Sequence, residues 1–396
     1  MTLAGLVILC LVSRPSRAQI PDVLCNEGSG TFEATFPTGV KVRVGAAKEG
    51  GLAKRLCEAA VGWDQHTELV ATDAFQLDVD AFGVDLGVGA PVVAFQLRKS
   101  SGDCCVTYQI YSLQKPSRLL RTITGGDFFS AADTDLDGRV QIWSHDAAAV
   151  AGFETFVVGE LDAPPTIVLR FEHGRLLDVS SEFRTYFDNE IEKIRKAIDQ
   201  QELRDFKSSN GTLTPPKSFS TEQLHRLRRV KVKVLEIVWS YLYSGREQEA
   251  QRSLAEMWPA ADVERILTAV LNARTHGIRA EVDGVSTGPG SKKKRVTIFD
   301  ATSRSEQNKS DIVSPRQIQL WRPPSSVPEQ SLSESEVLLD LVIDSAGKVR
   351  SAQPSGKTKL VDKDLIDATA EWKFIPAFKG DRPVACRTRL AVSPTR

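Results

Sequence analysis

The C-terminal part of the chain has a succession of strand, turn and helix patterns that restricts its fold more than any other segment does. Val337–Ile343 (VLLDLVI) is typical of a mostly buried strand, and the glycine-containing Asp344–Gly347 turn leads into a second strand over Lys348–Gln353. Leu360–Trp372 places apolar residues at helical spacing, and a last strand follows over Val384–Val392. The order strand, strand, helix, strand predicts a small ββαβ domain at the C-terminus.

The motifs of this region resemble the C-terminal domain of TonB-type energy transducers. They are VIDSAGKV at Val342–Val349, DLIDA at Asp364–Ala368 and WKFIPAFKGDRPV at Trp372–Val384. A Trp-x-Phe-x-Pro-Ala segment followed by Gly and Pro-Val is quite specific for that family. The resemblance covers about residues 331–394 and implies a TonB-like domain, which we bound at 335–396.

The resemblance implies a module that binds a protein partner, in that family a peptide from an outer-membrane receptor, with a link to energy-dependent transmembrane transport. An edge strand accepts an extended peptide by β-augmentation, and the candidate edge here is the last strand. The candidate partner-binding residues are Val384, Arg387, Arg389 and Val392. The two arginines are open to two interpretations, solvated gatekeepers that keep other strands off the edge or contacts to an acidic partner.

The N-terminus and the overall charge bear on where the protein acts. Leu3–Val12 is an apolar run too short to span a bilayer, and with the residues that follow it fits a signal peptide over residues 1–18. We therefore expect a periplasmic or secreted protein, with inner-membrane anchorage as the lesser alternative. The 51 basic and 51 acidic residues balance, so composition does not indicate nucleic acid as a partner.

Export would make disulfide bonds available to the cysteines. After removal of residues 1–18 the chain would hold five of its six cysteines, so at least one thiol would stay unpaired within the chain. Cys25 and Cys57 are the natural local pair. Cys104 and Cys105 are adjacent, and adjacent cysteines rarely bond to each other.

Residues 19–178 are predicted to form a mostly-β domain. Strand-like segments alternate with Gly, Ser, Asp and Pro at short intervals, which fits a small sheet, a sandwich or a propeller blade. These segments are Pro91–Leu97, Cys105–Leu113, Leu119–Ile123, Val140–Trp143, Phe156–Val158 and Thr166–Phe171.

An Asp-rich loop within this domain is a candidate structural calcium site. Three aspartates alternate before Gly138, a spacing that can turn three carboxylates onto one hard cation. The segment is similar to the calcium loop of FG-GAP or integrin-α-type repeats, and the alternative is an Asx-rich turn that needs no ion. The candidate site comprises Asp133, Asp135, Asp137, Arg139 and Gln141. A second acidic cluster, either a degenerate relative or a polar loop, comprises Asp78, Asp80 and Asp85.

Residues 179–280 are predicted to be helical and residues 281–334 to be a linker. Apolar residues recur at helical spacing through polar sequence, which indicates amphipathic helices. The predicted helices are Ser180–Phe206, Ser218–Gly245, Arg246–Trp258 and Ala260–His276. The linker is rich in Gly, Pro and Ser, with short ordered islands near Val296–Phe299 and Ile318–Trp321. The whole chain is therefore expected to be an α+β multidomain protein.

These patterns leave three classes of function. The first is an exported cell-envelope interaction protein whose TonB-like module docks a partner by strand addition. The second is a soluble, calcium-stabilised adhesion or scaffold protein in which the module is purely structural. The third is an enzyme, which the sequence disfavours because it contains no GxSxG, HExxH, P-loop or GxGxxG motif and its five histidines lack ligand spacing. We therefore expect a binding protein and not an enzyme.

Overall fold

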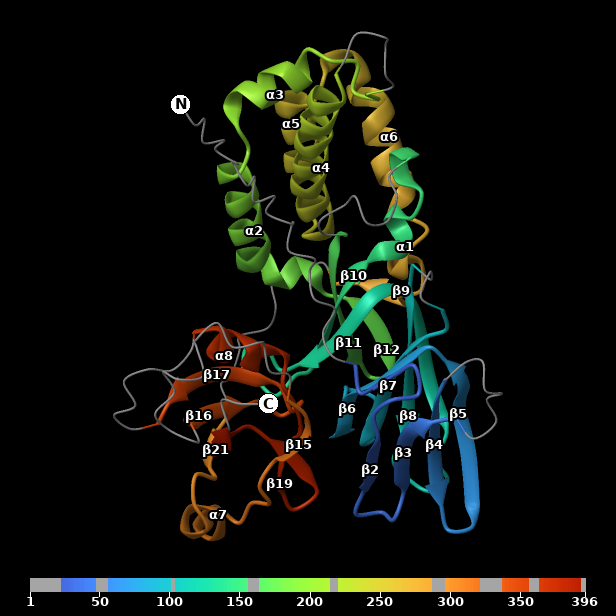
Figure 1. The fold of residues 1–396 in the computed structure, drawn as a ribbon, viewed down its shortest axis with the longest axis vertical. Coiled ribbons are helices and arrows are strands. Elements are labelled where there is room, and N and C mark those ends of the chain that lie inside the picture. Colours follow the sequence, from blue (N-terminus) through green and yellow to red (C-terminus); the bar gives the residue numbers. More distant parts are fainter. Residues whose placement is uncertain are drawn as a thin grey trace, which may run out of the picture.

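The chain folds as an α+β protein (Figure 1). The computed structural model describes residues 23–47, 56–100, 104–155, 164–213, 220–286, 296–320, 337–355 and 363–392. Figure 1 shows the helices of residues 184–273 at one end of the molecule, with the N-terminal strands and the C-terminal module, which has helices of its own, at the other. The predicted signal peptide, residues 1–18, lies outside the described residues.

The N-terminal region contains a nine-stranded sheet and a four-stranded sheet. The larger one has the order β1-β6-β7-β8-β9-β10-β11-β12-β13 and is antiparallel except for the β12–β13 pair. Its strands are β1 (Cys25–Asn26), β6 (Gln76–Val84), β7 (Val92–Arg98), β8 (Val106–Ser112), β9 (Leu119–Ala132), β10 (Gln141–Asp146), β11 (Thr166–Glu172), β12 (Arg175–Asp178) and β13 (Gly284–Val285). The smaller one is an antiparallel meander of β2 (Phe32–Thr35), β3 (Lys41–Ala46), β4 (Cys57–Trp63) and β5 (His66–Ala74).

Alternating burial explains why the two sheets pack against each other. In β3 the side chains of Val42 and Val44 are buried, whereas those of Lys41 and Arg43 are exposed, so one face of the strand is apolar. That face shares a core with Phe82 and other apolar residues of β6 and β7 in the larger sheet. The two sheets therefore bury a common hydrophobic layer between them.

Strand β9 is longer than the predicted strand Leu119–Ile123, because it continues to Ala132. The extension passes through Gly125 and Gly126, where a Cβ would lie 3.0 Å from the Ala148 side chain and 2.3 Å from the Ser144 hydroxyl. In the sequence, two consecutive glycines suggest the end of a strand. Here they lie within the strand and allow its backbone to pass close to Ala148 and Ser144. The predicted strand Phe156–Val158 lies outside the described residues.

The middle of the chain is helical, as expected, with one difference. The helices are α1 (Ala147–Val150), α2 (Arg184–Lys196), α3 (Gln200–Lys207), α4 (Thr221–Tyr243), α5 (Glu247–Met257) and α6 (Val263–Ala273). The single helix predicted over Ser180–Phe206 is wrong, because the Asp199 carboxylate accepts hydrogen bonds from the Gln201 and Glu202 amides and caps a new helix, α3. None of the helices that the structure describes is long and apolar enough to cross a membrane.

The C-terminal module is built on a four-stranded sheet with the order β14-β21-β16-β17. Its strands are β14 (Phe299–Asp300), β16 (Val337–Ile343), β17 (Val349–Pro354) and β21 (Cys386–Val392), and its helices are α7 (Arg304–Ser310) and α8 (Lys363–Ala368). Two further strand pairs join β15 (Arg316–Gln319) to β18 (Lys373–Ile375) and β19 (Ala377–Lys379) to β20 (Arg382–Val384). The module therefore contains the predicted strand, strand, helix, strand order with short strands added around it.

Residues of the predicted linker belong to the core of this module. Trp372 and Phe374, at 0% and 3% exposure, pack in one cluster with Ala301 and Ile312, which come from the segment between β14 and β15. Over the described residues 296–320, the segment is thus packed structure and not a linker, because its few apolar side chains find a hydrophobic surface to cover.

Candidate interaction site

The strand predicted as the docking edge lies inside the module's sheet for part of its length. One side of β21 pairs with β16 along the whole strand, and the other side pairs with β14, which runs parallel to it. The Phe299 amide donates to the Ala385 carbonyl (N···O 3.0 Å), and the Ala301 amide donates to the Arg387 carbonyl (2.7 Å). Residues of the predicted linker thus occupy one end of the candidate edge.

The other end of the β21 edge is open among the described strands. Since the Ala385 and Arg387 carbonyls face β14, and backbone direction alternates along a strand, the backbone groups of Arg389 and Ala391 point to the same side. Within the described ranges, no strand pairs with these two residues on that side. The open part of the edge is therefore short and lies beyond the end of β14.

The four predicted partner-binding residues do not lie on one surface. Arg387 and Arg389 are both exposed on the solvent face of β21. The Val392 side chain is fully buried opposite Val337, because the even-numbered side chains of β21 point into the core. Val384 belongs to the β19–β20 hairpin and not to β21. The candidate surface therefore comprises the two arginines and the open backbone edge.

Acidic side chains flank the two arginines. Arg389 Nε donates to Asp340 Oδ1 on β16 (2.8 Å), which raises the pKa of Arg389 and lowers the pKa of Asp340. On β14, hydrogen bonds from Thr302, with the charges of Arg387 and Arg389, lower the pKa of Asp300. In the register of β14 against β21, Asp300 lies opposite Arg387.

In the Asp-rich loop between β9 and β10, aspartate side chains accept hydrogen bonds from backbone amides of the same loop. The fully buried Asp133 carboxylate accepts hydrogen bonds from the amides of Asp137 and Gly138, both at 2.9 Å. Burial raises the pKa of Asp133, and these amides oppose that rise. Asp137 accepts from Arg139 Nη2 (2.7 Å), and the Gln141 side chain donates to the Arg139 carbonyl (2.8 Å). The loop therefore has the hydrogen bonding of an Asx-rich turn.

The hydrogen bonds within the loop leave acceptor capacity on its carboxylates. Calcium takes six to eight oxygen ligands, and an ionised carboxylate has about four acceptor positions, so the hydrogen bonds from Asp137, Gly138 and Ser345 do not use every acceptor position of Asp133. In the part of the chain that the structure describes, no group of three or more His, Cys, Asp or Glu side chains is placed to hold a metal ion. Calcium at the Asp-rich loop stays a prediction.

The glycine turn of the module binds the Asp-rich loop. The Asp133 amide donates to Asp344 Oδ2 (3.0 Å), and the Ser345 hydroxyl donates to Asp133 Oδ2 (3.2 Å). Asp344 is fully buried, and burial raises its pKa to about 7. At Gly347, φ is +85° and a Cβ would lie 1.9 Å from the Phe374 carbonyl oxygen, so only glycine fits the turn.

Two lysines of the module reach carboxylates of β6. Lys348 Nζ donates to Asp80 Oδ1 (2.6 Å), and Lys373 pairs with Asp78. The Tyr108 hydroxyl donates to Asp80 Oδ2 (2.6 Å), and burial together with the Asp80 charge raises the pKa of Tyr108. Burial alone would lower the pKa of Lys373, but the charges of Asp78 and Asp80 raise it. We call the contacts of Asp78, Asp80 and Asp133 with the module the seam.

The contacts of the seam were not predicted, although its aspartates were identified as acidic clusters. Asp78 and Asp80 were assigned to a polar loop or a degenerate calcium cluster, yet both lie within the buried strand β6. The register of β6 against β7 shifts at Asp80, and such a bulge re-aims a side chain. The signal that could have located the seam is a pair of aspartates inside an apolar strand, because buried carboxylates require cationic partners.

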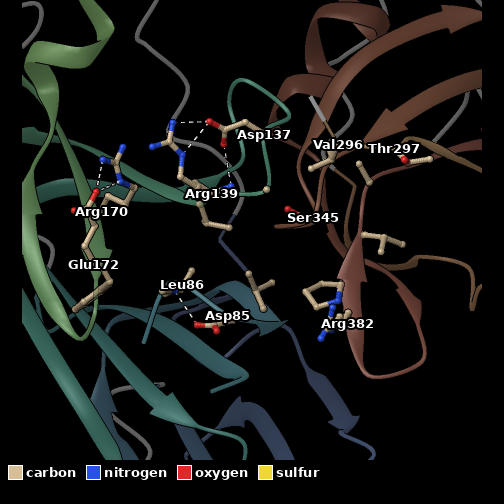
Figure 2. A pocket seen from close by; sticks show the side chains of 18 of the residues that line it. Asp85, Leu86, Asp137, Arg139, Arg170, Glu172, Val296, Thr297, Ser345 and Arg382 are labelled. Carbon is tan, nitrogen blue, oxygen red and sulfur yellow. Dashed lines mark hydrogen bonds and ion pairs between the residues drawn. The ribbon is translucent and has the colours of Figure 1, made fainter. Parts of the chain in front are cut away.

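A cavity of about 770 Å³ lies beside the seam, between the N-terminal sheets and the module (Figure 2). On the N-terminal wall, Figure 2 shows Arg139 paired with Asp137 and Arg170 paired with Glu172. Arg382 of the β19–β20 hairpin lies on the opposite wall. Arg139 and Arg170 pair with neighbouring carboxylates, and Asp85 accepts hydrogen bonds from the backbone amides of residues 87–89. The charged residues that line the cavity therefore do not form a convergent set of reactive groups.

The structure contains two disulfide bonds among the described residues. One joins Cys25 to Cys57, the pair that the sequence singled out, and links the two N-terminal sheets. The other joins the adjacent residues Cys104 and Cys105, so the expectation that they would not bond to each other is wrong. Cys386 is a free, buried thiol, and burial raises its pKa to about 12.

Comparisons with protein families, with curated proteins and with solved structures gave no significant match to this chain. Function therefore has to be argued from the geometry of the module and of the surfaces around it.

Proposed function

We propose that this protein is an exported cell-envelope interaction protein whose TonB-like C-terminal module binds a partner by strand addition to β21. The pairing of β14 with β21 supports this proposal best, because it is a parallel strand addition made by backbone hydrogen bonds. The edge at Arg389 and Ala391 offers the same bonds to a longer extended segment. By the resemblance, the partner is a peptide of an outer-membrane receptor, and its capture contributes to energy-dependent transport.

The side chains around the edge suggest what the partner carries. Asp300 of β14 lies opposite Arg387 in the register of β14 against β21. A partner strand that replaces or extends β14 would gain from an acidic residue at the same position, since charge-assisted contacts add specificity to backbone pairing. We therefore propose an extended segment with a carboxylate facing the two arginines.

The proposed location is the periplasm or the exterior, with the inner membrane as the lesser alternative. The Cys25–Cys57 disulfide supports export, because such bonds persist in oxidising compartments. The apolar run at Leu3–Val12 supports it as a signal peptide.

The experiment that tests the proposal measures binding of synthetic peptides from the periplasmic segments of outer-membrane receptors to the full chain. Ala391→Pro removes an outward amide from the open edge, and we expect it to weaken binding at least tenfold. Ala352→Pro is the matched control, because the same alternation places its amide on the opposite edge of the sheet, at β17. Equal binding by both variants, or no binding of any peptide by the parent chain, would reject the proposal.

A second candidate function is a soluble, calcium-stabilised scaffold in which the module is only structural. The seam favours it, because Asp344, Lys348 and Lys373 hold the module against the N-terminal sheets. This candidate predicts that calcium raises the thermal midpoint of the full chain and that Asp137→Asn abolishes the rise. An unchanged midpoint would remove the calcium part of this alternative.

A further inference from the structure

Strand β14 is the weaker of the two strands that pair with β21. It has two residues, and the Phe299 and Ala301 amides donate to the carbonyls of Ala385 and Arg387. On the other side, β16 pairs with all seven residues of β21 in antiparallel register. Because parallel pairs are also slightly less stable per residue, β14 contributes less backbone pairing to this sheet than β16 does.

The side chains of β14 add little apolar burial to this pairing. Phe299 and Asp300 are both half-buried, and Ile298 before them is 41% exposed. Ala301 after them is buried, but its side chain is a single methyl group. The inward side chains of β16 are all buried, namely those of Val337, Leu339, Leu341 and Ile343. Since stabilisation scales with the apolar area removed from water, β14 is easier to detach from β21 than β16 is.

The chain on each side of β14 is held by contacts of its own. The Val296 amide donates to the Leu136 carbonyl of the Asp-rich loop (2.8 Å), and Ile312, beyond α7, packs in the core of the module. The cavity in Figure 2 lies beside β14, because Val296, Thr297 and Phe299 line it. Strand β14 thus lies between two points of attachment and next to open space, so it can leave β21 while the module keeps its core.

We propose that the partner strand displaces β14 and pairs with β21 along its whole outer edge, so that β14 is an internal competitor for the site. This inference rests on the proposed function, strand addition to β21, and defines where the partner lies and what it replaces. A partner as long as β21 would pair with seven residues where β14 pairs with two, which favours the exchange. An acidic residue of the partner at the position of Asp300 would lie opposite Arg387.

The test combines amide hydrogen exchange with calorimetric titration of the full chain. The probes are the synthetic receptor peptides and a blocked peptide that copies residues 296–302 (VTIFDAT), which depends on no receptor. The variant Ala301→Pro removes the amide that donates to Arg387. Ile298→Pro is the matched control, because backbone direction alternates along a strand and the Ile298 amide points away from β21.

We expect the Phe299 and Ala301 amides of the free chain to exchange at least tenfold faster than the Leu390 amide. A saturating receptor peptide should speed exchange at Phe299 and Ala301 while it slows exchange at Arg389 and Ala391. Both probes should bind Ala301→Pro at least fivefold more tightly than the parent chain or Ile298→Pro, because the internal competitor is weakened. A purely structural β14 would give the opposite sign, a loss of affinity.

Three results would overturn the displacement of β14. They are protection of Phe299 and Ala301 equal to that of Leu390 in the free chain, retained protection of both amides in the peptide complex, and equal affinity of the probes for Ala301→Pro and Ile298→Pro. The second result would leave strand addition beyond β14 standing, so the proposed function would survive it. Binding of the copied peptide but of no receptor peptide would instead reject the proposed partner and support β14 as a displaceable strand. If Ala301→Pro fails to fold, exchange in the parent chain still decides the question.

Discussion

Asp344 illustrates how much of this structure depends on single buried groups. Its carboxylate sits without exposure between the module's glycine turn and the Asp-rich loop, and it accepts amide hydrogen bonds from Asp133, Ala346 and Lys348. Burial nevertheless raises its pKa to about 7. A group with a raised folded-state pKa stabilises the fold only while it is protonated, so its effect depends on pH.

The first prediction concerns the pH dependence of stability. Because the pKa of Asp344 rises from 3.8 in a model compound to about 7 in the fold, its contribution is complete below pH 4 and is lost as the pH rises to about 7. The slope from this group alone is at most about 1.4 kcal/mol per pH unit. Urea unfolding of the parent chain and of Asp344→Asn between pH 4 and 8 should give curves that diverge over this window. Parallel curves would show that Asp344 does not titrate there.

The second prediction compares two glycines with positive φ. At Gly347 a Cβ would lie 1.9 Å from the Phe374 carbonyl oxygen, whereas at Gly380 nothing lies within 4 Å. We expect Gly380→Ala to cost about 1 kcal/mol for the left-handed backbone alone, and Gly347→Ala to cost several times more. Denaturant titration of both variants measures the difference. Similar losses would mean that the turn can shift to admit a side chain.

At the scale of elements, capping and packing decide where helices and strands begin and end. Asp199 caps α3 through two amides, at 2.8 and 2.9 Å, and so divides a continuous amphipathic pattern into two helices. In the same way, the Ala385 and Arg387 carbonyls accept hydrogen bonds from the Phe299 and Ala301 amides. These bonds hold β14, which has two residues and is too short to be predicted from its own sequence.

The third prediction tests the cap. Asp199→Ala should lower the free energy of unfolding by about 1 kcal/mol, because the first amides of α3 lose their acceptor. Asp205→Ala is the control and should have a smaller effect, because the Asp205 carboxylate accepts a hydrogen bond from the Gln201 side chain on the exposed face of the same helix. Thermal unfolding followed by circular dichroism at 222 nm measures both. An equal loss in the two variants would argue against a capping role.

Local sequence patterns predicted the helices and strands whose own residues define them. They failed for elements whose position depends on contacts with residues far away in the sequence. The apolar spacing in Val337–Ile343 and in Thr221–Tyr243 is strong enough to define β16 and α4. By contrast, the strand that pairs with the outer edge of β21 contains Phe299, which lies far from β21 in sequence. No local pattern could therefore indicate that this edge is partly occupied. The pairing of Lys348 with Asp80 spans a sequence separation of 268 residues and is equally invisible in either local segment.

At the scale of the whole molecule, the module and the N-terminal sheets behave as one packed unit. Ile375 of the module belongs to the hydrophobic core of the N-terminal sheets, and the Phe36 and Phe378 rings meet at 6.2 Å. Lys348 and Asp80 form an ion pair whose side chains are 7% and 0% exposed. Because the module is packed in this way, β21 would have a fixed position relative to the N-terminal sheets when a partner binds, and it would not be carried on a flexible linker.

The fourth prediction concerns the seam. Lys348→Met leaves the buried Asp80 carboxylate without its cation, and we expect a loss of about 3 kcal/mol or more in stability. Adding Asp80→Asn should restore part of that loss, because it removes the uncompensated charge. Lys309→Met, at an exposed pair with Glu306, is the control and should leave the unfolding curve unchanged. A full-length chain that tolerates Lys348→Met would show that the seam is not held by this pair.

The central claim is that β21 binds an extended segment along its open edge, and residue-resolved amide hydrogen exchange of the full chain tests it most directly. The amides of Arg389 and Ala391 point away from β16 and should exchange fast in the free protein, whereas the Leu390 amide, bound to β16, should be protected throughout. Saturating amounts of the receptor peptide that binds most tightly should slow exchange at Arg389 and Ala391 and leave Leu390 unchanged. Peptide binding without protection of those two amides would contradict strand addition at β21.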